Sequence, residues 1–457
     1  MKRLISCVLA LLYVMAGFAS GTWILHGKEY RVDTLYHAYI GPGTTQTSIK
    51  LAGPVNLRVF YTTTDLKNEN VDVRAIKHKD TLTGLGTVSN AAESHSTSNR
   101  SYFAGINADF FSSSMPCGIT VVDGEVYCSD QASGWSLFGI DANKIPYSGG
   151  GDFYVKLTAP DYSTAELSAM NLERGTNGLV LYSSRKGANT GTDSNGSEVV
   201  LIPDGEGNFL TPGATVRMRV QGNPSHAGSM PIPDDGYILS GSGTKESFVS
   251  NLSEGDVVEV RCAIRFNGFT GGKIQQALGG CPMLVSGGKV LDTENALDHL
   301  TSAQPRTAVG YNAEKNKLVM LVADGRSSIS VGPISKVLAD IMIYAGCSEA
   351  MNFDGGGSST FYVKGEGVIN QPSDGSERSV TDGLYLSTDA PQNDVTITTI
   401  RFMDYAKTLN QGDAYTPVIY GYNQYGVLVD RNVEGVTLSC GSSLGTITND
   451  GTTLNAS

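Results

Sequence analysis

One stretch of this chain, residues 318–358, restricts the fold more than any other, because it has the pattern of a strand, a helix and a second strand. Leu318–Ala323 is a continuous apolar run of strand length that ends at Asp324. An apolar stripe of helical period follows, at Ile334, Val337, Leu338, Ile341, Met342 and Ala345. Glu349–Phe353 is a second short strand that ends at Asp354. Such a βαβ unit predicts two parallel strands joined by a right-handed crossover.

The two ends of the predicted helix carry residues that commonly flank helices. Pro333 is expected at the first helical position, where its fixed φ and missing N–H are tolerated. Gly346 is expected just beyond the last helical residue, where a left-handed backbone is common. The helix should therefore begin at Pro333 and end before Gly346.

Most of the remaining chain predicts short strands separated by turns. Val55–Tyr61 and Val71–Ile76 alternate apolar and polar residues. Ile119–Tyr127 alternates around Asp123-Gly124, which predicts a hairpin with a type I′ turn. Glycine supplies 55 of 457 residues without a Gly-X-Y period, as expected for many turns rather than for collagen. The predicted class is therefore α+β, a strand-rich mixed sheet with a βαβ unit near the C-terminal part of the main domain.

The first twenty residues have the pattern of a signal peptide. Lys2 and Arg3 precede an apolar run from Leu4 to Met15, and the small residues around Ala19 suit a cleavage site. Removing these residues leaves 31 basic and 45 acidic side chains, so the mature chain has a formal charge of 31 − 45 = −14. The expected location is secreted, periplasmic or at the cell surface.

The sequence changes character again after residue 390. Short strands are expected at Ile397–Phe402, Val418–Tyr420 and Val436–Ser439, as in the first strands of an immunoglobulin-like sandwich. The predicted organisation begins with a signal peptide at 1–20. A main domain follows at 21–390, with an N-terminal β part at 21–104 and a core at 105–390. The last part, 391–457, is expected to be an incomplete Ig-like segment.

Charge, hydropathy and cysteine content exclude several classes of protein. A net charge of −12 argues against a protein that tracks nucleic-acid phosphates, so no nucleic-acid partner is expected. No segment has the roughly 18 consecutive apolar residues of a transmembrane helix. Six cysteines remain besides Cys7 of the signal peptide, which allows 15 pairings, and no disulfide is assigned.

The two strands of the βαβ unit end in aspartates, which makes Asp324 and Asp354 candidate catalytic residues. Because parallel strands end at the same edge of a sheet, both should lie there, about 5 Å apart at the backbone if the strands are neighbours and about twice that with one strand between. Paired carboxylates suit glycoside cleavage. Alternatively each aspartate merely begins an Asp-Gly turn, or the two hold Ca²⁺ through oxygen ligands. No cofactor is expected to be required.

Gly355–Gly357, followed by Ser358, is an unusually flexible run directly after a strand. Successive glycines allow backbone N–H groups to converge on an anion, although a tight turn explains such a run as well. Arg306 and Arg378 near this loop would suit a phosphate-bearing substrate, since guanidinium binds phosphate through two hydrogen bonds. Asn107-Ala108-Asp109 ends another strand in polar groups.

Five segments together resemble the phosphodiester glycosidase family, whose animal member is the mannose-6-phosphate uncovering enzyme. The matching segments are Gly105–Phe111, Arg306–Gly310, Ala323–Arg326, Met351–Thr360 and Pro372–Arg378. Their order and spacing resemble the family from about residue 31 to residue 388. This chain has Ala108 and Asp109 where animal members have two glycines, which leaves the role of Asp109 open.

The resemblance implies a bacterial, exported glycosidase that hydrolyses a sugar-1-phosphodiester, such as a GlcNAc-1-phosphodiester, to free sugar and a phosphomonoester. The implied catalytic residues are Asp354, Asp324, Asn107 and Arg306. The implied substrate-binding residues are Asp109, Asn352, Gly355, Gly356, Gly357, Ser358 and Arg378. The alternatives are a non-catalytic surface protein that binds cell-surface glycans, and a hydrolase that modifies ordinary exopolysaccharide glycosides.

Overall fold

The computed structural model describes residues 21–130, 134–205, 209–266, 272–292, 301–404 and 409–456. The predicted signal peptide at residues 1–20, with Cys7, lies outside the described residues. The described chain is mostly β-strand, and its α-helices are α1 (Val88–His95), α2 (Glu246–Ser250) and α3 (Ser335–Tyr344). No helix in these ranges is long and apolar enough to cross a membrane. The six cysteines they contain are free thiols.

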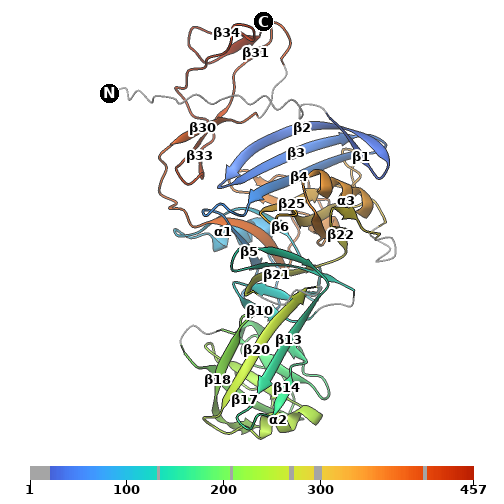
Figure 1. Ribbon diagram of the computed structural model, residues 1–457, viewed down its shortest axis with the longest axis vertical. Helices are drawn as coiled ribbons and strands as arrows, with labels where there is room; N and C mark the ends of the chain where they lie inside the picture. Colours follow the sequence, from blue (N-terminus) through green and yellow to red (C-terminus); the bar gives the residue numbers. More distant parts are fainter. Residues whose placement is uncertain are drawn as a thin grey trace.

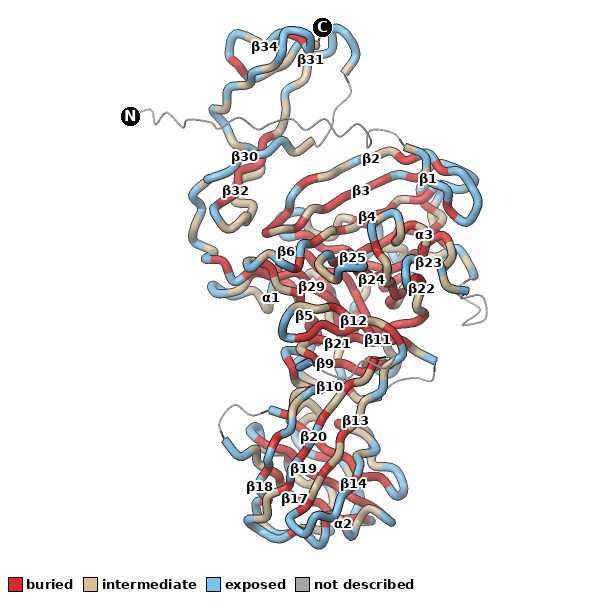
Figure 2. The backbone as a smooth tube through the Cα atoms, viewed as in Figure 1, coloured by how far each residue is buried: buried red, intermediate tan, exposed pale blue. Residues whose placement is uncertain are grey.

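The centre of the molecule is a sandwich of two sheets (Figure 1). One sheet has nine strands, in the order β1 (Gly21–Leu25), β2 (Lys28–Gly41), β3 (Thr44–Ala52), β4 (Asn56–Asp65), β25 (Lys317–Ala323), β24 (Arg306–Tyr311), β26 (Glu349–Asn352), β22 (Met283–Ser286) and β23 (Lys289–Val290). The other has five strands, in the order β28 (Gly367–Val368), β27 (Phe361–Val363), β6 (Ser101–Asn107), β29 (Asp382–Thr388) and β5 (Asp72–Lys77). The strands at the centre are mostly buried (Figure 2).

Strand β25 explains how the sandwich is layered. Its side chains alternate: Leu318, Met320 and Val322 pack toward the five-stranded sheet, whereas Val319 and Leu321 pack toward α3. A strand that is buried on both faces has a continuous apolar sequence, as this one does. Helix α1 packs on the outer face of the five-stranded sheet. The layers are therefore α3, nine-stranded sheet, five-stranded sheet and α1.

The predicted strand–helix–strand segment corresponds to β25, α3 and β26, with a third strand between the two. Both β25 and β26 pair antiparallel with β24, so they run in the same direction but are not neighbours. Gly346 follows the C-cap with φ 97°, as predicted. The position of Pro333 is a correction: Ile334 is the N-cap in an extended conformation, so Pro333 precedes the helix. There its carbonyl accepts a hydrogen bond from Arg306 Nε (3.3 Å).

The predicted hairpin around Asp123-Gly124 is confirmed. Strands β9 (Thr120–Val122) and β10 (Glu125–Cys128) pair antiparallel, and both turn residues have positive φ, 50° and 83°. The hairpin belongs to a five-stranded sheet that continues with β21 (Ile274–Gly280), β11 (Ser136–Asp141) and β12 (Pro146–Gly149). A two-stranded hairpin follows β6, made of β7 (Phe111–Ser112) and β8 (Met115–Pro116).

Residues 151–266 form a further sheet that the sequence did not separate from the predicted core at 105–390. It has eight strands, in the order β14 (Thr164–Glu166), β13 (Gly151–Thr158), β20 (Val257–Phe266), β18 (Thr215–Ser225), β17 (Ser197–Pro203), β19 (Tyr237–Gly241), β16 (Leu179–Tyr182) and β15 (Ala169–Met170). Most members of its hydrophobic cluster come from the sheet itself, and α2, connecting loops and the neighbouring five-stranded sheet contribute the rest. In Figure 1 it lies at the opposite end of the molecule from the C-terminus.

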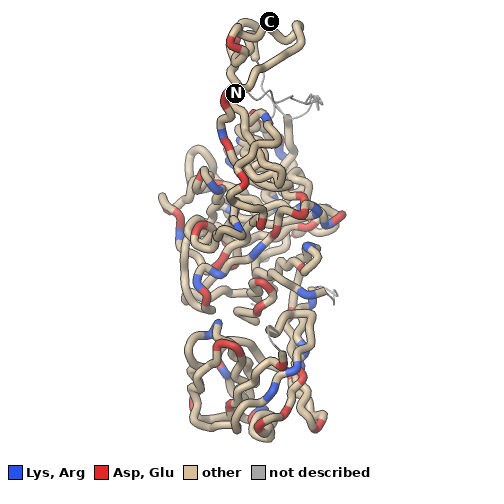
Figure 3. The backbone as a smooth tube through the Cα atoms, turned by 90° about the vertical axis from the view of Figure 1, so that its left-hand side faces the viewer, with Lys and Arg blue, Asp and Glu red and all other residues tan. Residues whose placement is uncertain are grey.

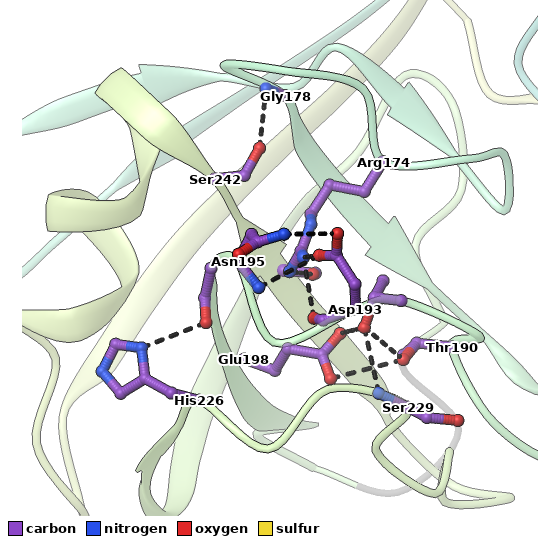
Figure 4. A network of polar contacts seen from close by, with 12 residues as sticks. Arg174, Gly178, Thr190, Asp193, Asn195, Glu198, His226, Ser229 and Ser242 are labelled. Carbon is purple, nitrogen blue, oxygen red and sulfur yellow. Dashed lines mark hydrogen bonds and ion pairs between the residues drawn. The ribbon is translucent and has the colours of Figure 1, made fainter.

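A buried carboxylate organises one long loop of this eight-stranded sheet (Figure 4). Glu198 is 1% exposed and accepts hydrogen bonds from Thr190 Oγ1 (3.3 Å), Thr192 Oγ1 (2.9 Å) and Met230 N (3.1 Å). Beside it, Arg174 donates to Asp193 Oδ1 (2.6 Å). These three donors come from the loop and from its neighbouring segment, so the network fastens the loop to the sheet.

The chain after residue 390 forms two small antiparallel sheets. One contains β30 (Thr399–Phe402), β32 (Ile419–Tyr422) and β33 (Leu428–Asp430), and the other β31 (Ala414–Tyr415), β35 (Leu454–Ala456) and β34 (Gly445–Ile447). The predicted strand at Val436–Ser439 is wrong, because this half-exposed segment pairs with no neighbouring strand. The Ig-like character of the region stays a prediction.

Candidate active site

Polar side chains collect at one end of the central sandwich. Strands β6, β25 and β26 end there, and β24, β27 and β29 begin there, because neighbouring strands are antiparallel. Asn107 is the last residue of β6 and Asp382 is the first of β29. Asp324 and Asp354 follow β25 and β26. The sequence predicted that these last two would share an edge, and the strand directions place them at the same one.

Asn107 joins three of these strand ends. Its Nδ2 donates to the carbonyl of Asp354 (2.7 Å), and its Oδ1 accepts from Thr307 Oγ1 (2.8 Å) and from the backbone N–H of Thr360 (3.1 Å). The side chain is fully buried. Asn107 was predicted as a catalytic residue, but its amide group is occupied by protein partners, so in this structure it positions the Asp354 backbone.

Asp324 is a buried carboxyl that retains hydrogen-bond donors. It is 3% exposed, and its Oδ1 accepts from the N–H of Gln371 (2.9 Å) and from Asn370 Nδ2 (3.3 Å). Burial raises the pKa of Asp324 to about 6, and the two donors oppose this rise. A carboxyl that titrates near neutral pH suits general acid–base chemistry.

Asp354 is the more exposed of the two acids. It is half-buried, and its backbone N–H donates to the carbonyl of Ala108 (2.8 Å). Burial raises the pKa of Asp354 to about 6, against the Ser358 hydroxyl and the positive charge of Arg378, which lower it. With β24 between their strands, Asp324 and Asp354 are about 10 Å apart at the backbone.

Two arginine side chains, those of Arg326 and Arg378, lie against the glycine loop Gly355–Gly357. A Cβ on Gly357 would overlap both the Arg378 guanidinium and the Asp374 carboxylate, and Arg326 Nη2 lies 3.0 Å from where a Cβ on Gly356 would be. Arg378 donates to Ser358 Oγ (3.3 Å) and pairs with Asp374 (2.6 Å). Because glycines have no side chains, the loop leaves space between these two guanidinium groups. The Arg378 group is partly exposed and the Arg326 group is exposed.

Arg326 is a site residue that the sequence analysis missed as a candidate. Its side chain is exposed, and it donates to Gln304 Oε1 (2.6 Å) and Ser373 Oγ (3.4 Å). The available signal was its place two residues after Asp324, at the same strand end. A residue that follows a strand end so closely remains at that end of the sheet.

Two predicted residues are buried against protein partners. The Cδ atom of Arg306 lies 3.8 Å from where a Cβ on Gly355 would be, so this side chain lies under the glycine loop. Arg306, expected to contact phosphate, is 3% exposed and donates to the carbonyls of Pro333 (3.3 Å) and Ser302 (2.8 Å). Successive side chains of a strand face opposite ways, so Thr307 meets Asn107 and Arg306 does not. Burial, with the nearby charge of Arg326, lowers the pKa of Arg306 to about 10.

Asn352 was expected to contact the substrate, but its side chain is 1% exposed. Its Nδ2 donates to the carbonyls of Cys281 and Phe353, both at 2.7 Å. Asn352 therefore fixes the backbone before Asp354 instead of reaching a ligand.

Near Asp354 lies a pair of buried carboxyls, Asp109 and Asp382. The sequence analysis did not identify Asp382 as a candidate. The Asp109 N–H donates to Asp382 Oδ1 (2.9 Å), and the Gly118 N–H donates to Asp109 Oδ2 (2.8 Å). Both residues are at most 1% exposed. Burial and their mutual repulsion raise the pKa of Asp109, whereas the charge of buried Lys77 opposes the rise in the pKa of Asp382.

The burial of Asp109 bears on its predicted role in substrate binding. Its Oδ1 has no hydrogen-bond partner in the described structure. A side chain that is 1% exposed does not reach a substrate. Asp109 is therefore held behind the site by the Gly118 N–H instead of contacting a substrate.

The surroundings of Asp324 and Asp354 do not fit the Ca²⁺ alternative. Calcium takes six to eight oxygen ligands. Here N–H and hydroxyl donors and an arginine charge surround the two carboxyls, and donors and positive charges do not bind a cation. Among the described residues, no three acidic, histidine or cysteine side chains are grouped to hold a metal ion.

Comparison with known proteins supports the resemblance seen in the sequence. The sequence model of the family described as phosphodiester glycosidase matches residues 211–387. This match confirms the resemblance over a part of the chain that contains Asp324, Asp354 and Arg378. It does not extend to Asn107 or Asp109.

A segment of 88 residues is 40% identical to the SPbeta prophage-derived uncharacterized protein YomE of Bacillus subtilis strain 168. It covers 19% of this chain and 13% of that protein. The chain thus spans only a small part of this relative.

Two solved structures share the fold. A protein of Burkholderia pseudomallei K96243 that is described as exported has a TM-score of 0.59 at 17% identity, over 80% of this chain and 98% of that one. A hypothetical protein from Synechocystis has a TM-score of 0.58 at 16% identity, over 76% of this chain and 62% of that one. At these identities the likeness shows the fold alone.

Proposed function

Because residues 211–387 match the phosphodiester glycosidase family, we propose that this chain hydrolyses a sugar-1-phosphodiester to free sugar and a phosphomonoester. The observation that carries the proposal is one end of the sandwich where two carboxyls that titrate near pH 6 lie beside a glycine loop and exposed arginines. The acids suit bond cleavage at a sugar, and the arginines suit a phosphate.

In the proposed mechanism, Arg326 and Arg378 bind the phosphodiester. The Gly356 N–H already donates to the carbonyl of Pro305 (2.9 Å), so the glycine loop contributes space for the phosphate rather than a set of N–H donors. A phosphomonoester is a good leaving group, so it needs stabilisation of its charge more than it needs a proton. Asp354, the more exposed acid, accepts a proton from water as the water oxygen bonds to the anomeric carbon. The bond between that carbon and the phosphate oxygen breaks, and its electron pair leaves with the phosphate.

Asn107 and Asn352 act through the backbone on either side of Asp354, which they hold in place. Asp324 forms the second acidic group of the site and is held by Asn370 and the N–H of Gln371. Because Asp324 is 3% exposed, we assign it no direct contact with the substrate. Burial raises its pKa to about 6, so its charge changes close to neutral pH and alters the electrostatics of the site.

Export is part of the same proposal. It rests on the signal-peptide pattern of residues 1–20 and agrees with the description of the Burkholderia protein that shares the fold. Processing at the predicted site would give an N-terminus near residue 21, which sequencing of the secreted protein measures.

The direct test is incubation with a GlcNAc-1-phosphodiester and an assay for free GlcNAc. Asp354→Asn should lower kcat by at least about 100-fold, since general-base groups contribute 10²–10⁴-fold. Asp234→Asn, in an exposed turn between β18 and β19, is the matched control. Glycan binding without turnover would support a non-catalytic protein instead. Faster cleavage of aryl glycosides than of phosphodiesters would support an ordinary glycoside hydrolase.

A further inference from the structure

Two aromatic side chains meet beside the acids of the candidate site. The rings of Phe110 and Trp135 are 5.0 Å apart between centroids and inclined by 67°, an edge-to-face contact. Both residues are only partly buried. An aromatic pair that keeps part of its surface exposed next to polar groups differs from one that fills a core, and it offers an apolar surface to a ligand.

The chain connections place this pair close to Asp354. Phe110 directly follows Asp109, and its carbonyl accepts a hydrogen bond from the N–H of Cys117 (2.9 Å). The backbone N–H of Asp354 donates to the carbonyl of Ala108 (2.8 Å), two residues before Phe110, so this segment and Asp354 are in direct contact. The aromatic pair and the acids are therefore joined by one short segment of chain.

A glycosyl phosphodiester has two chemically different parts. The phosphate matches the arginines, but a pyranose ring also has an apolar face made of C–H groups. Ligand sites commonly combine apolar and aromatic walls with a few polar groups that fix orientation. The side chains so far assigned to this site are polar, and they leave the apolar face of the sugar without a partner.

We propose that Trp135, supported edge-on by Phe110, is the surface on which the sugar ring of the substrate stacks. This inference rests on the proposed function, because it names the part of the site that binds the glycosyl group. Tryptophan suits this role because its large, rigid ring covers a sugar face with little loss of conformational entropy.

The chain contains an internal control for this proposal. It has two tryptophans, and the other, Trp23, stacks on Tyr344 of α3 with centroids 4.6 Å apart and planes inclined by 7°. That pair lies on the outer face of the nine-stranded sheet, with strand β1. Trp23→Phe therefore leaves Trp135 as the one tryptophan in the protein.

The experiment titrates GlcNAc into the wild type, Trp23→Phe and Trp135→Phe, following tryptophan fluorescence and, in parallel, heat of binding. The Trp23→Phe protein should keep a saturable fluorescence change, whereas Trp135→Phe should lose it. By calorimetry the Kd for GlcNAc should rise about threefold in Trp135→Phe, which keeps an aromatic ring, and at least tenfold in Trp135→Ala. Inorganic phosphate should bind both Trp135 variants as it binds the wild type, which also verifies that they are folded.

Activity separates this proposal from the one on which it rests. With the phosphodiester, Trp135→Ala should raise KM far more than it lowers kcat, because it removes binding common to substrate and transition state. If the wild type cleaves the phosphodiester and Trp135→Ala has an unchanged KM, the proposed stacking role of Trp135 is wrong, whereas the proposed hydrolase activity is supported. If the wild type binds GlcNAc through Trp135 without cleaving, the proposed reaction is wrong and the stacking surface stands. A wild type that binds none of GlcNAc, glucose and galactose overturns the stacking surface.

Discussion

Replacing Asp324 by asparagine should make the protein more stable at neutral pH, which is unusual for a change at a buried position. Asn keeps the Oδ1 oxygen that accepts from Gln371 and Asn370, so the hydrogen bonds are retained. It removes the carboxylate charge that burial disfavours. The substitution therefore measures the unfavourable free energy of burying an ionised carboxylate at this position.

The size of the effect follows from the pKa. Burial moves the pKa of Asp324 from 3.8 to about 6, and each unit corresponds to about 1.4 kcal/mol, so the full difference is about 3 kcal/mol. Because the folded pKa is the higher one, the wild type has this stability below pH 3.8 and loses it as the pH rises through 6. Asp324→Asn has no such loss, so its advantage over the wild type should grow by about 3 kcal/mol across this interval.

Urea titrations followed by tryptophan fluorescence, at steps between pH 4 and pH 7.5, measure this difference. Both tryptophans lie outside the eight-stranded sheet, so the signal reports on the part of the molecule that contains Asp324. Asp234→Asn, an exposed substitution, should follow the wild type throughout. Equal pH dependence in Asp324→Asn and the wild type would refute the argument, because it would mean that Asp324 titrates alike in the folded and unfolded chains.

Three further outcomes are expected. Glu198→Ala should lower the free energy of unfolding by about 2–4 kcal/mol in urea titrations, because three donors lose a buried acceptor; no loss would mean that water replaces the carboxylate. Arg326→Gln should raise KM for a phosphodiester at least about tenfold and leave cleavage of a neutral aryl glycoside unchanged, with Arg401→Gln as control; equal effects on both substrates would contradict a phosphate contact. The kcat/KM of the wild type should fall as the pH drops through about 6, because protonated Asp354 cannot act as a base; a flat profile would exclude that role.

Local patterns in the sequence predicted the elements of the site. The apolar run before Asp324 and the helical stripe after it led to two strands with a common direction, and the structure has them. The Asp123-Gly124 turn was predicted because only a few residues accept positive φ at both positions. Each of these predictions depends on residues that are close together in the chain.

Non-local pairing decided what the sequence did not predict. Strand β24 lies between β25 and β26 and thereby sets the spacing of the two acids. Its place depends on which strands pair along the edges of β25 and β26, and the local sequence does not determine this. Which face Arg306 occupies depends on register, since a shift of one residue would exchange it with Thr307. Asp382 meets Asp109, 273 residues away in the chain, because β29 pairs with β6, and nothing in the sequence near either residue marks that pairing.

The direction in which aspartate pKa values are shifted separates this site from the rest of the molecule. Among the described residues, the aspartates with raised pKa values are Asp109, Asp324, Asp354 and Asp382. All four lie at the same end of the sandwich, and burial is the main cause for each. The aspartates with lowered pKa values are Asp161, Asp193, Asp389, Asp394 and Asp450. In each of these five, hydrogen bonds from neighbouring side chains stabilise the charged carboxylate, which makes the folded protein more stable. Burying four acids at one place lowers the free energy of unfolding, because each carboxylate would be better solvated in water. Groups with perturbed pKa values that cost stability in this way are characteristic of functional sites.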